Sequence, residues 1–215
     1  MKLLSLNVGL PRAVKWRGET VTTGIYKAPV QGAVMLRRLN LDGDRQADLS
    51  VHGGVTKAVY VYPTEHLDFW RGELPDMAFA PGTFGENFSS QGLLENAVHI
   101  GDRFRIGEAE VVVTEPRMPC YKLAVKFGRT DILRRFLQSG RSGFYLAVTR
   151  EGEVQAGDTF EPMSYEAHRL SVADVVRLYA FDHDDIETLR RAVQVEALPL
   201  KWRGIFQQQL DELEQ

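Results

Sequence analysis

The stretch VHIGDRFRIGEAEVVV, residues 98–113, decides the fold class. Gly101-Asp102 and Gly107-Glu108 separate short runs that are rich in β-branched and aromatic side chains. Such runs are typical of strands, and turns this short join neighbouring antiparallel strands. The stretch therefore predicts a meander of antiparallel strands.

Two segments outside the meander also predict strands. Residues 58–62, AVYVY, form a nearly continuous apolar run, as expected for a strand that is buried on both faces. Residues 144–149 are expected to begin another hairpin, with its turn at Glu151-Gly152. Strands therefore dominate the chain from its start to about Met163.

Helices are few in this region. One helix is expected at residues 64–71, opened by Pro63, and a second at residues 131–138. Residues 75–96 show little regular periodicity, and long irregular loops in compact domains are often functional. Many short strands with few helices predict a β-barrel or a strongly curved sheet with a few peripheral helices.

The C-terminal part has a helical pattern. Ser171 and Asp174 have the spacing of a capping box, and apolar residues follow at helical intervals. Asp184 or Asp185 could cap a second helix, and Pro199 could open a third. These signals predict a unit of three amphipathic helices.

We therefore expect two domains, a β-barrel at residues 1–165 and a three-helix domain at residues 166–215. Helices of about ten residues are marginal alone in water, so they should pack on each other, on the β domain or on another subunit. Their apolar faces could cover the barrel, form a homodimer or dock an electron donor.

Composition excludes several classes of protein. The 215 residues are 44% hydrophobic and 26% charged, which is typical of a folded globular chain. The net charge of −3 argues against general nucleic-acid binding, which needs a basic excess. The sequence shows neither a signal peptide nor an apolar run of about 20 residues, so we expect a cytoplasmic protein that does not bind membranes.

The single cysteine, Cys120, lies in the stretch TEPRMPCYK, residues 114–122. Pro116 and Pro119 restrict the backbone, so the cysteine is expected on a stiff, non-helical corner after a strand. A thiol held in this way suits a nucleophile or a metal ligand. A lone cysteine can also be a small buried hydrophobic residue, and this alternative stays open.

Basic residues are concentrated around Cys120. Residues 116–141 contain one acidic residue, Asp131, and seven basic ones: Arg117, Lys122, Lys126, Arg129, Arg134, Arg135 and Arg141. Positive charge favours the thiolate, the form that attacks or binds metal, and it also attracts phosphate. Arg117, Lys122 and Arg141 are the stronger candidates because they adjoin the proline corner or lie between glycines. The adjacent Arg134 and Arg135 could equally belong to a solvated helix face.

Two glycine-containing stretches are further candidates. HGGVTKA, residues 52–58, places two glycines between His52 and Lys57, just before the buried strand. GTFGENF, residues 82–88, contains Asn87 in the irregular loop. Glycine lets the backbone approach a ligand closely. Each stretch could equally be a simple turn, and His52 a structural histidine.

A metal site made of protein ligands alone is not indicated. The five histidines lack zinc-site spacing, and one cysteine cannot complete a four-ligand set. A metal would therefore take most of its ligands from a cofactor. One soft thiolate beside cations fits a metal that is carried by a sulfur-rich, phosphorylated organic cofactor.

Four motifs in this order resemble those of the MOSC domain family. They are HGGxxKAVY at 52–60, GxFGEN at 82–87, GDxFxIG at 101–107 and PRxPCxK at 116–122. The trailing helices and the overall length resemble the YiiM-like branch of that family. The resemblance covers essentially the whole chain.

The resemblance implies a β-barrel that binds the molybdenum cofactor, in which a molybdopterin carries molybdenum. Cys120 would be the catalytic cysteine and the thiolate ligand of the metal. The implied activity is reduction of N-hydroxylated compounds, such as hydroxylamino analogues of nucleobases, to amines.

The resemblance also implies which side chains line the cofactor or substrate pocket: His52, Lys57, Asn87, Arg117 and Lys122. We expect Lys57, Arg117 and Arg141 to neutralise the phosphate of the pterin. Asn87 would hydrogen-bond the pterin or the substrate, and His52 would supply or relay a proton as a second catalytic residue.

The chain shows no flavin, NAD or iron-sulfur motif, so a separate electron donor is implied, either a flavoprotein or an iron-sulfur reductase. The substrate would be a small molecule. An alternative is a carrier or sensor of the cofactor, or of sulfur held on Cys120 as a persulfide, without catalysis of its own. A cysteine hydrolase with His52 as base is a third interpretation, but it lacks an evident orienting residue.

Overall fold

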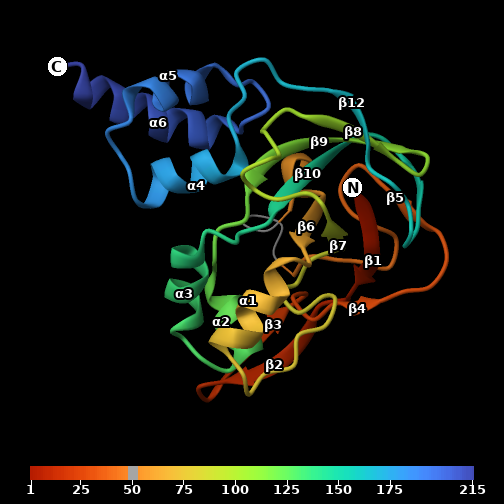
Figure 1. The fold of residues 1–215 in the computed structure, drawn as a ribbon. Helices are drawn as coiled ribbons and strands as arrows, with labels where there is room; N and C mark the ends of the chain where they lie inside the picture. Colours follow the sequence, from red (N-terminus) through yellow and green to blue (C-terminus); the bar gives the residue numbers. More distant parts are fainter. Residues whose placement is uncertain (48–52) are drawn as a thin grey trace.

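The computed structural model describes residues 1–47 and 53–215, arranged as Figure 1 shows. Eight of the described strands form one curled sheet, in the spatial order β12-β8-β9-β10-β6-β7-β1-β4. All neighbours in this sheet are antiparallel except β6 and β7, which are parallel. In chain order the strands are β1 Lys2–Val8, β4 Ala28–Pro29, β6 Val59–Pro63, β7 Phe88–Gln91, β8 Arg103–Ile106, β9 Ala109–Pro116, β10 Phe144–Arg150 and β12 Glu161–Ser164.

The curled sheet comes close to closing on itself. The segment just before β12 bonds to the first strand, since Leu3 N donates to Asp158 O at 2.9 Å and Phe160 N donates to Met1 O at 3.1 Å. Two small ribbons accompany the sheet: β2 Arg12–Trp16 with β3 Glu19–Thr23, and β5 Val34–Leu36 with β11 Gly152–Val154. The predicted strand-rich, barrel-like architecture is confirmed.

Strand β6 divides the hydrophobic interior into two parts. All five of its residues are buried, as its apolar run predicted. Val59 and Val61 belong to the cluster inside the curled sheet, whereas Tyr60 and Tyr62 belong to a second, aromatic-rich cluster, because side chains alternate along a strand. The second cluster is built with the three helices that Figure 1 shows grouped at one end of the sheet: α1 His66–Glu73, α2 Tyr121–Phe127 and α3 Ile132–Ser139.

These helices agree only partly with the sequence pattern. Helix α1 begins two residues later than expected, because Pro63 is the last residue of β6. Helix α3 lies one residue later than predicted, because Asp131 is its N-cap residue. Helix α2 was not predicted, since it has seven residues and follows two prolines closely. A short 3-10 helix, η1 Val55–Lys57, leads into β6.

Two strand pairings predicted from the sequence are wrong. Strands β8 and β9 pair as expected, but residues 98–100 do not join them. Asp102 accepts a hydrogen bond from His99 N, and Ile100 N donates to Leu170 O instead. Strand β11 does not fold back on β10 and pairs with β5 instead.

The three predicted C-terminal helices are present as α4 Val172–Ala180, α5 Ile186–Gln194 and α6 Leu200–Leu213. Ser171 and Asp174 form the capping box, Asp185 rather than Asp184 caps α5, and Pro199 precedes α6. Among the described residues, no helix combines the length and apolar character that crossing a membrane would require.

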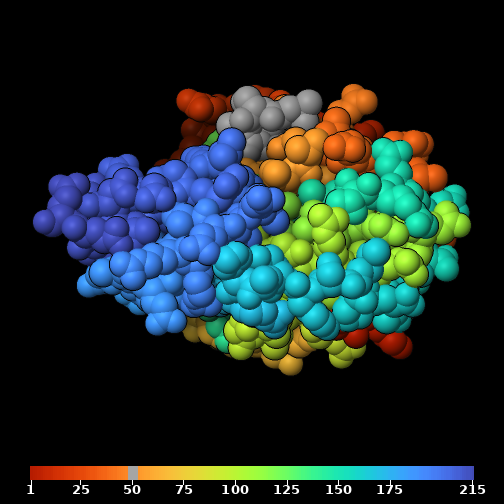
Figure 2. Space-filling model, turned by 90° about the horizontal axis from the view of Figure 1, so that it is seen from above, coloured from red at the N-terminus to blue at the C-terminus, as the bar shows by residue number. Residues whose placement is uncertain are grey.

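The C-terminal helices pack against the curled sheet. Figure 2 shows them as a blue lobe against one side of the β-rich part. Their buried residues, including Val175, Leu189 and Phe206, belong to the same hydrophobic cluster as Ile100 and Val113 of the β-rich part. Of the three roles considered for these helices, the structure therefore shows that they cover the barrel. The exact boundary at residues 165 and 166 stays a prediction.

Replacing Asp185 by alanine is expected to lower the free energy of unfolding by about 1 kcal/mol, because its carboxylate caps α5. A hydrogen bond from Thr188 N, helped by Arg177, lowers the pKa of Asp185 to about 2 from 3.8. A carboxyl whose pKa is lowered by folding stabilises above its unfolded pKa, and this contribution is lost as the pH falls toward 2. Denaturant titrations of both proteins from neutral pH downward measure the difference. Asp185→Asn should keep most of the cap, and a difference that does not shrink in acid would contradict the assignment.

Candidate functional site

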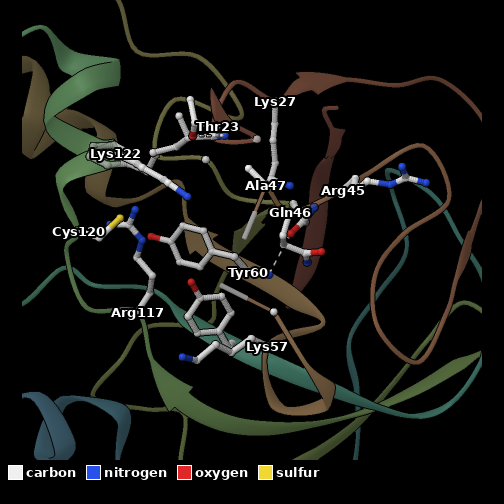
Figure 3. Close-up of a pocket in the computed structure, with 17 residues that line it drawn as sticks. Thr23, Lys27, Arg45, Gln46, Ala47, Lys57, Tyr60, Arg117, Cys120 and Lys122 are labelled. Carbon is white, nitrogen blue, oxygen red and sulfur yellow. Dashed lines mark hydrogen bonds between the residues drawn. The ribbon is translucent and has the colours of Figure 1, made fainter. Parts of the chain in front are cut away.

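One cavity gathers most of the side chains that the sequence singled out. Its described walls come from the loop after β3, the segment before the 3-10 helix, β6, the loop before β7, the start of α2, and β10. The lining residues are Thr23, Gly24, Ile25, Lys27, Arg45, Gln46, Ala47, Gly53, Lys57, Tyr60, Phe84, Gly85, Asn87, Arg117, Cys120, Lys122 and Tyr145. Figure 3 shows Cys120, Arg117 and Lys122 on one side of the cavity and Lys27 and Arg45 across from them.

The cavity is strongly cationic. Five of its described lining residues are basic and none is acidic: Lys27, Arg45, Lys57, Arg117 and Lys122. Two of these cations have acidic partners, since Lys27 pairs with Asp44 and Lys57 Nζ lies 3.7 Å from Glu115 Oε2. The remaining positive charge favours an anionic ligand.

Arg117 is a buried cation with unused hydrogen-bonding capacity. It is 5% exposed, and its guanidinium carbon lies 5.3 Å from the centre of the Tyr60 ring and 5.2 Å from that of Phe136. Its Nη1 atom has no hydrogen-bond partner in the structure as described. Burial alone would lower the pKa of Arg117, but the nearby Tyr60 and Tyr145 outweigh this and raise it. A charged guanidinium with one nitrogen lacking a partner, placed beside a cavity, is suited to bind an anion.

Cys120 lies on the predicted stiff corner. Its backbone is extended, with φ −127° and ψ 164°, and it is the N-cap residue of α2, between the end of β9 and the helix. Its side chain is partly exposed and lines the cavity, so it is not a sealed core residue. A negative charge on Cys120 would lie close enough to contribute to the raised pKa of Arg117. The structure therefore joins the sulfur and the buried cation in one site.

Lys122 reaches the same cavity from the first turn of α2. Its side chain extends toward Tyr60 in Figure 3, and the residue is 8% exposed. No acidic group of the described ranges lies within ion-pair distance of it. The helix can present this lysine because its other side packs Leu123, Ala124 and Phe127 into the aromatic-rich cluster.

Asn87 lines the cavity, but its side chain is engaged within the protein. Its Nδ2 donates to Asp44 Oδ2 at 2.9 Å and to Asn7 O at 3.3 Å, and its Oδ1 accepts a hydrogen bond from Tyr60 N. These bonds tie the loop that carries Asn87 to three other segments: β1, the loop at Asp44 and β6. The structure thus gives Asn87 a part in building the wall, and the expected bond to a pterin or substrate stays a prediction.

One expected site residue, Arg141, is not brought to the cavity in the described structure. The guanidinium carbon of Arg141 lies 3.9 Å from the centre of the Phe69 ring, and Nη1 donates to Ser139 O. Helix α3 ends at Ser139 with Gly140 in the left-handed conformation, and the chain then places Arg141 against α1. His52 lies outside the described residues, so its expected proton-transfer role stays a prediction.

Neither of the two tyrosines of the cavity was predicted to be a site residue. Tyr60 and Tyr145 are cross-strand partners in β6 and β10, and their ring centres are 5.4 Å apart. Burial raises the pKa of Tyr145 to about 12, so its phenol is protonated at neutral pH. Tyr60 uses its hydroxyl to donate to Ser142 O. The apolar run at 58–62 located Tyr60, but only strand pairing could place Tyr145 beside it.

A lysine behind the cavity gives a test of the local electrostatics. Lys126 Nζ donates to Ile25 O and Gly82 O, and burial lowers the pKa of Lys126 to about 8 from 10.5. The unfolded chain therefore binds more protons than the folded one between these pH values, and stability rises with pH there. Relative to Lys126→Met, the wild type should gain about 1 to 2 kcal/mol of unfolding free energy between pH about 7.5 and about 9.5.

Chemical denaturation at several pH values measures this gain. Lys201→Met, at an exposed lysine, is the matched control and should follow the wild type. Parallel curves for wild type and Lys126→Met would contradict the lowered pKa.

The donor set of the cavity fits a metal carried by an anionic organic group. Cys120 can supply one soft sulfur ligand, and Arg117, Lys57 and Lys122 can bind phosphate oxygens by charge-assisted hydrogen bonds. In the described ranges, no cluster of histidine, cysteine, aspartate and glutamate side chains could hold a metal ion without such a group.

Comparison with known proteins identifies the family of the chain. Residues 48–161 match the MOSC domain, and residues 170–213 match the YiiM-like, 3-alpha helix domain. Protein YflK of Bacillus subtilis (strain 168) is 42% identical over 211 residues, 98% of this chain and 95% of that protein. A protein named Reductase from Gibberella moniliformis (strain M3125 / FGSC 7600) is 31% identical over 181 residues, 83% of this chain but 32% of that protein.

A solved structure shares the whole fold. YiiM from Geobacillus stearothermophilus superimposes with a TM-score of 0.81 at 32% sequence identity, covering 97% of this chain and 98% of that one. Both the barrel and the helical unit are therefore family features. The chain belongs to the MOSC domain family, in its YiiM-like branch.

Proposed function

We propose that the protein is a molybdenum-cofactor-dependent reductase that converts N-hydroxylated compounds, such as hydroxylamino nucleobase analogues, to amines. The observation that carries the proposal is the meeting of Cys120 with the buried, unsatisfied Arg117 in one cationic cavity. The fungal relative named Reductase supports the reaction class.

Four side chains of the cavity would bind the cofactor. Cys120 would ligate the metal, because a thiolate binds metals and the extended backbone at Cys120, just after Pro119, holds it in place. Arg117, Lys57 and Lys122 would bind the phosphate of the pterin. When bound, the cofactor supplies a centre that passes two electrons to the substrate.

The reaction needs electrons and protons in equal number. Cleavage of the N–O bond of R-NHOH consumes two electrons and two protons and releases R-NH2 and water. Tyr145 can donate a hydrogen bond to the substrate oxygen, because its phenol stays protonated at neutral pH. The Tyr60 hydroxyl is already bonded to Ser142 O, so it holds the wall rather than the substrate.

The electrons would come from a separate flavoprotein or iron-sulfur reductase. The sequence contains one cysteine, whereas an iron-sulfur cluster needs several cysteine ligands. That cysteine lies in the cofactor cavity. The chain therefore depends on a donor that docks near the cavity.

The test uses intact protein produced in cells that make the molybdenum cofactor. We expect about one molybdenum per chain and formation of the amine from a hydroxylamino purine when a chemical reductant is supplied. Bound molybdenum without turnover would favour the carrier or sensor function. Absence of both molybdenum and reductant-dependent turnover would overturn the proposal.

A further inference from the structure

The C-terminal helical unit reaches the cavity through one buried carboxylate. Trp202 of α6 is 7% exposed, and its Nε1 donates a hydrogen bond of 2.9 Å to Glu115 Oε2. Glu115, near the end of β9, is 5% exposed. Its second oxygen, Oε1, accepts a hydrogen bond of 3.2 Å from Thr56 Oγ1. Both oxygens of the carboxylate are thus held by donors from outside its own strand.

Lys57 follows Thr56 and carries this contact into the cavity. Its Nζ lies 3.7 Å from Glu115 Oε2, which is close enough for attraction but beyond the length of a normal hydrogen bond. The same ammonium lies 5.8 Å from the centre of the Tyr145 ring on the cavity wall. Lys57 therefore keeps its N–H donors available to a ligand in the cavity.

The turn that carries Lys57 is held by the strand that bears Glu115. Gly54, its N-terminal residue, has φ +92°, a conformation that favours glycine. Thr114 Oγ1 donates to Thr56 O at 2.6 Å, so the strand that bears Glu115 also holds the backbone of the turn. With the backbone held in this way, the distance between Lys57 Nζ and the Glu115 carboxylate depends on where the two side chains point.

We infer that Trp202 is a positioning residue for the anion site: its hydrogen bond directs Glu115 so that Lys57 stays available to phosphate instead of forming a close ion pair. The inference rests on the proposed function, in which Lys57 binds the phosphate of the cofactor. It gives the helical unit a role in the chemistry of the cavity besides covering the barrel.

The test compares Trp202→Phe with the wild type, using inorganic phosphate as the probe and titration calorimetry to measure its dissociation constant. Phenylalanine keeps an aromatic ring beside Tyr179 and Phe206 but removes the N–H donor. Glu115 should then turn to Lys57, and phosphate should bind about three- to tenfold more weakly, since hydrogen bonds to charged groups are worth about this much or more. A crystal structure of the variant should show Lys57 and Glu115 within hydrogen-bond distance.

Two further variants separate this effect from loss of packing. Phe206→Leu disturbs the core of α6 without touching Glu115, so it should lower stability but leave phosphate affinity unchanged. Glu115→Gln removes the competing charge, so adding it to Trp202→Phe should restore phosphate affinity. Thermal unfolding of every variant records the change in stability separately.

The outcomes are distinguishable. Equal phosphate affinity of wild type and Trp202→Phe would overturn the inference, as would an equal loss in Phe206→Leu. If Lys57→Met leaves phosphate binding of the wild type intact, or if no phosphate binds, the anion site of the proposed function fails, and the inference fails with it. Selective weakening in Trp202→Phe, restored by Glu115→Gln, supports the inference.

Discussion

Cys120→Ser is expected to reduce the molybdenum content of protein from cofactor-producing cells at least about tenfold and to abolish reductant-dependent turnover. A serine hydroxyl is neutral and donates less charge to a metal than a thiolate, which is the form of cysteine that binds metals. Metal analysis by mass spectrometry, with protein concentration measured in parallel, checks the first effect. Product analysis with a hydroxylamino purine checks the second.

The same substitution should not destabilise the protein. Cys120 is the N-cap residue of α2 and makes no side-chain cap hydrogen bond, and serine is a preferred N-cap residue. We expect an unfolding free energy equal to that of the wild type or higher by up to about 1 kcal/mol. Tyr121→Phe, at the adjacent exposed tyrosine, is the matched control and should keep its molybdenum. Cys120→Ser protein that retains full molybdenum would exclude the thiolate as the metal ligand.

Arg117→Met is expected to stabilise the protein without cofactor while weakening cofactor binding at least about tenfold. The buried Nη1 of Arg117 has no partner in the described structure, and an unsatisfied buried donor costs about 1 to 3 kcal/mol. Methionine removes this cost and fills similar space, although the contacts of the cation with Tyr60 and Phe136 are lost. A net gain of about 1 kcal/mol would raise the melting temperature by about 2 to 4 °C.

The weaker cofactor binding of Arg117→Met is measured separately from its stability. Removing a charge-assisted hydrogen bond to phosphate costs about 1.5 to 3 kcal/mol, which is about ten- to a hundredfold in affinity. Phosphate titration and molybdenum content report it directly. Arg134→Met, at an exposed arginine of α3, is the control for net charge and should leave both readouts unchanged. Destabilisation by Arg117→Met, or unchanged phosphate affinity, would contradict the assignment of Arg117 to an anion site.

Much of the candidate site could be predicted from local sequence. Pro116 and Pro119 restrict the backbone before Cys120, so the non-helical corner followed from the sequence itself, whereas the partial exposure of the thiol did not. Arg117 and Lys122 were found because they adjoin this corner. Ser171, Asp174 and the following apolar spacing likewise predicted α4, since a helix cap depends on residues within one turn.

Contacts between distant segments could not be predicted in this way. Arg141 looked equivalent to Arg117, but the turn after α3 places it on Phe69, because a left-handed residue at the helix end sets the direction of the chain. Tyr145 and Glu115 carried no sequence signal, because their importance comes from cross-strand pairing and from a tryptophan that is 87 residues away in the chain.

The sequence by itself determined most of the helices and strands, the cysteine corner and the family to which the chain belongs. These depend on backbone restriction and on the spacing of apolar residues, which act over a few neighbouring positions. Only the tertiary structure decided which cations share a cavity with Cys120 and which carboxylates restrain them. Electrostatic and hydrogen-bonding contacts act through space, so the pairing of strands and the packing of α6 had to bring Trp202, Glu115 and Lys57 together.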